Sequence, residues 1–275
     1  MSNKVEVFDS RRNQLGEGPT ATGLKNNHIQ WCDIYGQAVR WRDLDTGAIG
    51  EYSTNEAIGF QIPRKTSGEI LGTANGPILR DSDGKISKLP TREEADGVGD
   101  KVPLRWNDAK VSPFGDLFLG SMAYSNQSNE GSFYKLSKDG KRMFYIDTLT
   151  MRVDLFDVDE SQISNRRPFI KFDDGVGYPD GMCTDTDDNL WVAFWQGYCV
   201  RGFDGTNGKQ IAEIKVPSAN ATSCVFGGEK LDKLIITSAV GNPGEFADLE
   251  KYPESGFVFI TSTGTTGKRT NLFGL

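Results

Sequence analysis

The chain of 275 residues has a formal charge of −7 at pH 7, 32 glycines and 11% aromatic residues. No basic stripe offsets the acid excess, which argues against a nucleic-acid partner, and no apolar run approaches the ~18 residues of a membrane span. The first residues contain no apolar signal core, so we expect a cytoplasmic protein that binds small molecules or cations and no membrane.

One short pattern recurs along the chain: a polar turn, an apolar strand of four to six residues, and then a small or acidic residue. It occurs at residues 28–33, 69–74, 116–122, 142–147, 189–194 and 233–238. A second strand that ends in a polar hairpin follows most copies. Six such units predict an all-β fold, a six-bladed β-propeller, and chains of this length are often single units. We therefore expect one propeller domain over residues 1–275.

The two ends of the chain are expected to close the ring. Residues 5–8 alternate between apolar and polar side chains and should pair with the last strand, near residues 256–261. This pairing would protect the edges of the first and last sheets. Helical signals are scarce, and residues 91–96 and 244–251 are interpreted as loop excursions.

The spacing of the repeat is uneven. One apolar anchor marks each copy: Ile29, Ile70, Leu117, Met143, Leu190 and Leu234. The intervals between them are 41, 47, 26, 47 and 44 residues. The third interval is short by roughly 20 residues, the length of two strands with a turn. Because the turn at residues 137–141 both ends one hairpin and leads into the next strand, we expect a shortened segment between the third and fourth blades.

The common catalytic motifs are missing from the sequence. It has no G-x-S-x-G elbow, P-loop, G-x-G-x-x-G or H-E-x-x-H segment, and its single histidine, His28, begins a strand. The four cysteines lie far apart without a C-x-x-C motif, which predicts free thiols. Asp185-Thr-Asp-Asp-Asn189 fails as an EF-hand loop and is interpreted as a solvated β-hairpin. An enzyme built on this sequence would use carboxylates and amides, with or without a metal.

Three polar residues precede the inner strands of their blades by similar distances: Glu17, Asn107 and Asp180. Equivalent positions of successive blades converge on the axis of a propeller, so the three side chains can meet there. Hard oxygen donors of this kind suit Ca²⁺, Mg²⁺ or Mn²⁺. The alternative is an ordinary turn residue at each position, since Pro179-Asp-Gly181 is a common β-turn sequence.

Eight segments, taken in order along the chain, resemble the SMP-30/regucalcin and gluconolactonase family. They are Leu15–Pro19, Trp106–Lys110, Phe118–Ala123, Tyr145–Thr148, Arg152–Asp157, Ile163–Arg167, Pro179–Met182 and Thr222–Gly228. The resemblance implies a six-bladed propeller with one divalent cation in its central channel, Ca²⁺ first, with Zn²⁺, Mn²⁺ or Mg²⁺ as alternatives. It also implies hydrolysis of a sugar lactone of the gluconolactone type by a monomer or dimer.

The resemblance implies particular roles for five residues. Glu17, Asn107 and Asp180 match three of the family's metal ligands, and Asp180 also matches its general base. Arg105 matches a residue that holds the substrate, which Asn107 would contact as well. Tyr124 stands where some members have an acidic substrate contact, so sugar hydroxyls would be recognised differently here.

One departure from the family pattern supports a second hypothesis. The family's other metal-binding asparagine lies in a Ser-Asn-Gly segment that opens the fourth blade, and this segment falls within the short interval. Without that ligand the chain would be a non-catalytic calcium- or sugar-binding propeller. The sequence leaves both hypotheses open.

Overall fold

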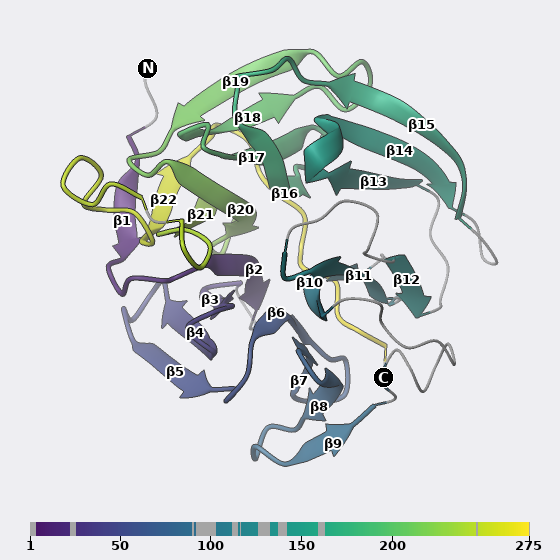
Figure 1. Ribbon diagram of the computed structural model, residues 1–275, viewed down its shortest axis with the longest axis vertical. Helices are drawn as coiled ribbons and strands as arrows, with labels where there is room; N and C mark the ends of the chain where they lie inside the picture. Colours follow the sequence, from purple (N-terminus) through teal and green to yellow (C-terminus); the bar gives the residue numbers. More distant parts are fainter. Residues whose placement is uncertain are drawn as a thin grey trace.

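The computed structural model describes residues 4–22, 26–89, 91, 103–111, 115, 117–125, 133–136, 142–158, 163–245 and 247–274. Within these ranges the strands form six antiparallel sheets that follow one another around a common axis (Figure 1). Among the described residues, no helix is long and apolar enough to span a membrane. The prediction of an all-β propeller is confirmed.

Four of the six sheets have four strands each. The first has β2 (Gly16–Thr22), β3 (His28–Asp33), β4 (Ala38–Asp43) and β5 (Ile49–Ser53). The second has β6 (Ile58–Pro63), β7 (Glu69–Thr73), β8 (Gly76–Arg80) and β9 (Ile86–Lys88). The fifth has β16 (Tyr178–Thr184), β17 (Leu190–Trp195), β18 (Cys199–Phe203) and β19 (Gln210–Lys215). The sixth has β20 (Asn220–Gly227), β21 (Lys233–Ala239), β22 (Val258–Ser262) and β1 (Glu6–Asp9).

The remaining two sheets have three described strands each. The third sheet contains β10 (Leu104–Val111), β11 (Leu117–Ala123) and β12 (Phe133–Leu136). The fourth contains β13 (Arg142–Asp147), β14 (Arg152–Val158) and β15 (Ile163–Lys171), with the short 3₁₀ helix η1 (Thr148–Thr150) after β13. The two incomplete sheets flank the position where the sequence predicts a shortened segment. The turn expected at residues 137–141 lies outside the described residues.

The register of the strands distinguishes the fourth sheet from the other five. The innermost strands β2, β6, β10, β16 and β20 each shift register against their neighbour, as at a β-bulge. β13 pairs with β14 without a shift and lies farther from the axis (Figure 1). The described residues therefore supply five inner strands, where the sequence predicted six complete blades. The fourth sheet, which supplies no inner strand among the described residues, lies directly after the short interval of the repeat.

Burial differs between the second strands and the outer strands of the sheets. Every residue of β7 is buried, and β17 is buried except at its last residue, because neighbouring sheets cover both faces of these strands. The outer strands β5 and β19 are largely exposed. Apolar side chains of adjacent sheets pack together; Trp191 of β17 meets Phe226 of β20 edge to face at 6.0 Å. This arrangement explains the short continuous apolar runs of the repeat.

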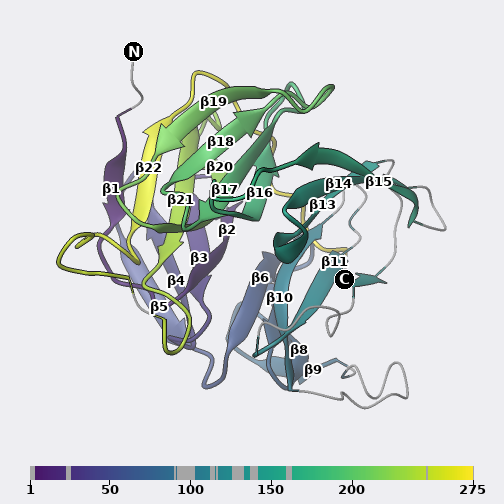
Figure 2. The ribbon, with the colours of Figure 1, turned by 45° about the horizontal axis from the view of Figure 1, so that its top comes forward.

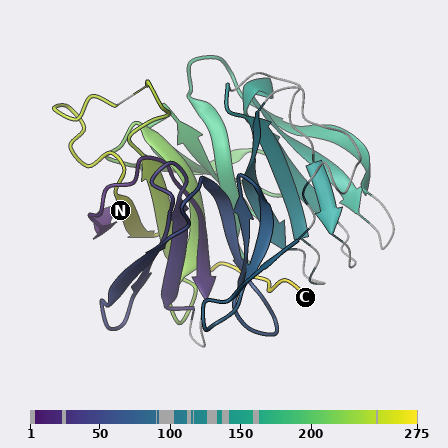
Figure 3. The same ribbon diagram turned by 60° about the horizontal axis from the view of Figure 1, so that its bottom comes forward.

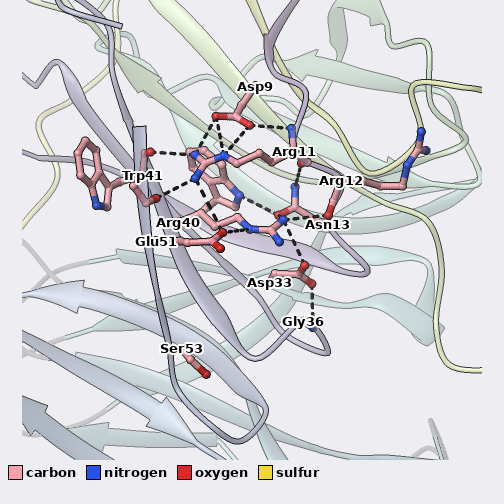
Figure 4. A network of polar contacts seen from close by, with 12 residues as sticks. Asp9, Arg11, Arg12, Asn13, Asp33, Gly36, Arg40, Trp41, Glu51 and Ser53 are labelled. Atoms are coloured by element: carbon pink, nitrogen blue, oxygen red, sulfur yellow. Dashed lines mark hydrogen bonds and ion pairs between the residues drawn. The ribbon is translucent and has the colours of Figure 1, made fainter. Parts of the chain in front are cut away.

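The N-terminal strand closes the ring as expected. β1 pairs antiparallel with β22, so the first described strand completes the last sheet (Figure 2). The segment that follows crosses to the first sheet through the polar network of Figure 4. In it, the buried Asp9 carboxylate accepts hydrogen bonds from Arg11 Nε (3.0 Å) and Nη2 (2.8 Å). Arg11 also donates to the carbonyl oxygens of Trp41 and Gly50 in the first sheet.

A second part of this network is centred on Asn13. Its side chain is fully buried, donates to Gly256 O at 2.7 Å and accepts hydrogen bonds from Trp31 Nε1 and Arg40 Nη1. Arg40 also lies 3.4 Å from the buried Asp33 carboxylate. The network joins the last sheet to the first. It therefore holds the segment after β1, which pairs with β22, against the first sheet.

The segment after β22 runs across one end of the propeller (Figure 3). Phe273 is buried and bonds to backbone groups of Pro63 and Lys65 in the second sheet. Three further hydrogen bonds join this segment to the far ends of β2 and β10 and to the turn after β16: Thr270 to Ala21, Asn271 to Val111, and Thr266 to Thr186. Glu17 and Asp180 lie near the beginnings of β2 and β16, and Asn107 lies in the first half of β10, so the segment covers the opposite end.

Candidate metal and active site

The three residues predicted as metal ligands occupy corresponding places on their strands. Each register shift of β2, β10 and β16 falls at or beside one of them, between Glu17 and Thr20, between Trp106 and Ala109, and between Pro179 and Met182. A bulge turns a side chain that regular pairing would direct elsewhere. The three residues therefore occupy corresponding positions, but they lie within the innermost strands, whereas the sequence predicted that they precede these strands. The apolar copies that follow them are the second strands β3, β11 and β17. The roles of the three residues remain predictions.

The other two inner strands carry small residues at the corresponding shift. β6 has Gly59, where a Cβ atom would lie 2.1 Å from the carbonyl oxygen of Trp106. β20 has Thr222, whose hydroxyl donates to Gly16 O at 2.5 Å. Gly59 thus lets β6 approach β10, and Thr222 ties β20 to β2. The acidic and amide side chains come from the other three strands.

The carboxylates of this region influence one another strongly. Burial raises the pKa of Glu17 to about 7, and the charge of Asp108 contributes to the increase. Burial also raises the pKa of Asp180 well above its ordinary value, with Glu17 and Asp108 adding to the effect and Arg105 opposing it. Charges act in this way when like groups are close in a poorly solvated place. The structure therefore brings Glu17 and Asp180 into one electrostatic cluster, together with Asp108.

Asp108 and Lys110 were not predicted as site residues. Lys110 Nζ lies 3.6 Å from Asp108 Oδ1. Partial burial disfavours the charged form of Lys110, but the carboxylates of Asp108 and Glu17 outweigh this effect and raise its pKa. Both residues belong to the segment Trp106-Asn-Asp-Ala-Lys110. Their closeness to Asn107 in the sequence was the one observation that could have marked them as site residues. Alternation along a regular strand would have placed Asp108 on the face opposite Asn107, and the bulge invalidates that reasoning.

Arg105 is a buried cation at the edge of the cluster, with 3% of its surface exposed. Its Nη1 donates to Asn107 Oδ1 at 2.8 Å and to Trp106 O at 3.1 Å, and its guanidinium lies 5.7 Å from the centre of the Tyr35 ring. Its Nε is buried and has no hydrogen-bond partner among the described residues. A buried donor without a partner is costly, so this group is suited to an acceptor on a bound molecule.

Asn107 and Tyr124 are placed differently from each other. The side-chain oxygen of Asn107 already accepts the bond from Arg105, which leaves one lone pair for a cation or a substrate. Tyr124 is 40% exposed and follows β11, with its amide bonded to Pro103 O. Partial burial raises the pKa of its phenol, and the influence of Arg105, Tyr35 and Glu56 on that pKa places it in the same region. Sequence reasoning missed Tyr35, which lies in the turn after β3, and Glu56, which lies in the connection between β5 and β6.

The donor set fits a divalent cation in its chemistry. Glu17, Asp108 and Asp180 supply hard oxygen atoms. Burial is the main cause of the raised pKa values of Glu17 and Asp180, and the neighbouring carboxylates add to it. A bound cation would remove this repulsion. In the part of the chain that the structure describes, no three His, Cys, Asp or Glu side chains are already grouped in metal-binding geometry. The amide of Asn107 would have to complete the set, with adjustment of the side chains.

A family model, the SMP-30/Gluconolactonase/LRE-like region, matches residues 15–138 and 134–240. The chain belongs to this family. Regucalcin of Danio rerio is 33% identical over 292 residues, and regucalcin of Homo sapiens is 33% identical over 301 residues. Each match covers 96% of this chain and 96% of the relative. The family resemblance inferred from the eight segments is confirmed.

Solved structures show the same fold. A luciferin-regenerating enzyme superposes with a TM-score of 0.87 at 26% identity, covering 100% of both chains. A calcium-binding protein, regucalcin, from Agrobacterium tumefaciens gives a TM-score of 0.87 at 22% identity, covering 100% of this chain and 99% of the other. A gluconolactonase from Xanthomonas campestris gives 0.73 at 17% identity, covering 94% and 89%. At identities of 22% and 17%, the last two comparisons show a common fold and no more.

The comparisons also locate the short interval. The two matches of the family model meet at residues 134–138, within the stretch where the sequence predicted the break. The alignment with the Danio rerio protein spans 292 positions, more than the 275 residues of the chain, so the relative has residues that this chain lacks. The family's second asparagine, implied for the start of the fourth blade, has no counterpart among the described residues before β13.

Proposed function

We propose that the chain is a cation-dependent hydrolase that opens sugar lactones of the gluconolactone type to the corresponding acids. The observation that carries the proposal is the cluster of the Glu17, Asp108 and Asp180 carboxylates beside the buried Arg105 guanidinium. Family membership and the gluconolactonase fold of one solved structure support the same reaction class. Glu17, Asn107 and Asp180 would hold the cation, Ca²⁺ first, and Asp108 is a further candidate.

The cation, when bound, supplies Lewis-acid polarisation of the lactone carbonyl. Asp180 takes a proton from the attacking water on a carboxylate oxygen, as a general base. Arg105 and Lys110 are the cations that favour the ionised forms of the carboxylates, which this role requires. Arg105 donates from its unpartnered Nε to a ring or hydroxyl oxygen of the sugar, and Tyr124 offers a phenol for hydroxyl groups at the same end.

The test is Asp180→Asn, assayed for lactone hydrolysis while calcium binding is measured by calorimetry on the same preparation. We expect the variant to lose at least ~10²-fold in kcat, the usual contribution of a general base. Asp187→Asn is the matched control, since Asp187 is an exposed carboxylate on the hairpin after β16 and should leave turnover unchanged. Full turnover of Asp180→Asn with cation bound would refute the base assignment.

A second candidate, a calcium- or sugar-binding propeller without turnover, is favoured by one observation. The fourth sheet has no bulged inner strand among the described residues. We propose that the six sheets correspond to six blades, and that one deletion removed the outer strand of the third together with the inner strand of the fourth. Those two strands are consecutive in the chain, so a single loss accounts for both sheets. Calcium binding without hydrolysis of any sugar lactone would favour this candidate.

A further inference from the structure

Two cysteines that are 41 residues apart meet where the fifth and sixth sheets touch. Cys183 of β16 and Cys224 of β20 have their sulfur atoms 3.5 Å apart, and neither forms a disulfide. The approach of the two strands depends on Gly181, where a Cβ atom would lie 2.2 Å from Ser223 Oγ and 2.9 Å from Ser223 Cα. The missing side chain therefore lets the strands come close enough for the thiols to touch.

We propose that Cys183 and Cys224 form a redox-active pair that hydrogen peroxide converts into a disulfide between the two inner strands. The inference is independent of the proposed lactonase activity. The sequence predicted free thiols at all four cysteines and gave no sign of this pair, because the contact joins strands of different sheets.

The surroundings of the two sulfurs differ, which assigns them different roles. Cys224 is 1% exposed, and its Sγ donates to the carbonyl oxygen of Trp191 at 3.2 Å. Cys183 is only partly buried and lies near the Lys110 ammonium, whose charge favours the thiolate. Burial nevertheless raises the pKa of Cys183, with Cys224 and Asp185 adding to the increase, so its reaction should accelerate as the pH rises. Cys183 is the thiol that peroxide reaches first.

The chemistry balances with one peroxide molecule. The Cys183 thiolate attacks one peroxide oxygen, the O–O bond breaks, and a sulfenic acid forms as hydroxide leaves. The Cys224 thiolate then attacks the Cys183 sulfur, the S–O bond breaks, the S–S bond forms, and the departing hydroxide is protonated to water. Two thiols lose two electrons, and the peroxide is reduced to two molecules of water.

The remaining cysteines provide internal controls. Cys32 and Cys199 are both fully buried, and Cys32 Sγ contacts the carbonyl oxygens of Glu17 and Gly59. Neither has a second sulfur beside it among the described residues. Both should stay reduced under conditions that oxidise the pair. The disulfide would fix β16 to β20 three residues after Asp180.

The experiment treats the folded full-length chain with hydrogen peroxide, alkylates the remaining thiols and maps the peptides by mass spectrometry. We expect two of the four thiols to disappear, with a loss of two hydrogen atoms and one linked peptide pair containing Cys183 and Cys224. Cys199→Ser should keep the cross-link. In Cys224→Ser, or Cys224→Ala if the serine variant does not fold, a sulfenic acid on Cys183 should be trapped by dimedone.

Two results would overturn the proposal. One is a cross-link that involves Cys32 or Cys199 in the folded protein. The other is a folded protein that keeps four thiols with peroxide but loses two after unfolding, since the pair would then have no reactivity of its own.

Discussion

Glu17 should couple cation binding to proton release. Its pKa of about 7 in the folded protein means that about nine in ten of these carboxyls carry a proton at pH 6 and about one in ten at pH 8. A cation can bind only the ionised form. Binding at pH 6 should therefore release close to one proton from Glu17. From Glu17 alone, the dissociation constant for calcium should be about tenfold weaker at pH 6 than at pH 8.

The assay is isothermal calorimetry of Ca²⁺ binding at pH 6 in two buffers with different ionisation enthalpies, which gives the number of protons released. Glu17→Gln removes the titrating group, so the release at pH 6 should fall by about one proton, while the exposed Asp187→Asn control should leave it unchanged. Calcium binding to the unaltered protein with equal affinity and no proton release at pH 6 and pH 8 would refute the reasoning.

The raised pKa of Glu17 also predicts how the stability of the cation-free protein depends on pH. Stability should fall as the pH rises, whereas the affinity for the cation should increase. A carboxyl whose pKa rises on folding binds its proton more tightly in the folded state. The contribution of Glu17 to the free energy of unfolding is therefore fully present below its unfolded-state pKa of 4.5. It is lost as the pH rises through the folded-state pKa of about 7. Glu17→Gln should escape this loss and exceed the parent protein in free energy of unfolding at pH 8, by up to about 3 kcal/mol. Urea denaturation in chelator measures the difference, and a less stable variant would contradict the sign.

Two further predictions concern the scaffold, and chemical denaturation measures both. Arg11→Ala should lower the free energy of unfolding by about 3 kcal/mol, because it leaves the buried Asp9 carboxylate unpaired. Arg167→Ala breaks an exposed ion pair and should cost less than about 1 kcal/mol, so equal losses would contradict the ring-closing role of Arg11. Gly59→Ala should cost about 1–3 kcal/mol, since its Cβ would meet backbone atoms of β10. Gly120→Ala has no such clash, and an unaffected Gly59→Ala would contradict the close approach of β6 to β10.

The propeller could be predicted from the sequence because its strands carry a strong local signal. Strands covered on both faces, such as β7 and β17, are short apolar runs between turns, and the alternation of residues 5–8 anticipated the pairing of β1 with β22. The shortened segment was also visible in the sequence, since the interval of 26 residues between Leu117 and Met143 is the outlier of the repeat. These features depend on residues that are close together in the sequence or on the number of residues between repeats.

Contacts between sheets could not be predicted in the same way. Asp108 joins the acidic cluster because a bulge alters the alternation of β10, and a bulge has no clear sequence signature there. Tyr35 reaches Arg105 from a turn of the first sheet. Asp185 was expected in a solvated hairpin, yet it is fully buried, and its carboxylate accepts hydrogen bonds from Asn189 and Trp191. Each of these depends on how distant elements approach one another.

The central claim is that a cation held by Glu17, Asn107 and Asp180 makes this propeller a lactonase. It is tested most directly by following acid release from a panel of aldonolactones, above the spontaneous rate, with Ca²⁺, Mn²⁺ or Zn²⁺ and with chelator. We predict hydrolysis of at least one lactone that a cation supports, that chelator abolishes and that readdition of the cation restores. A protein with calcium bound that accelerates the hydrolysis of no lactone in the panel would contradict the claim.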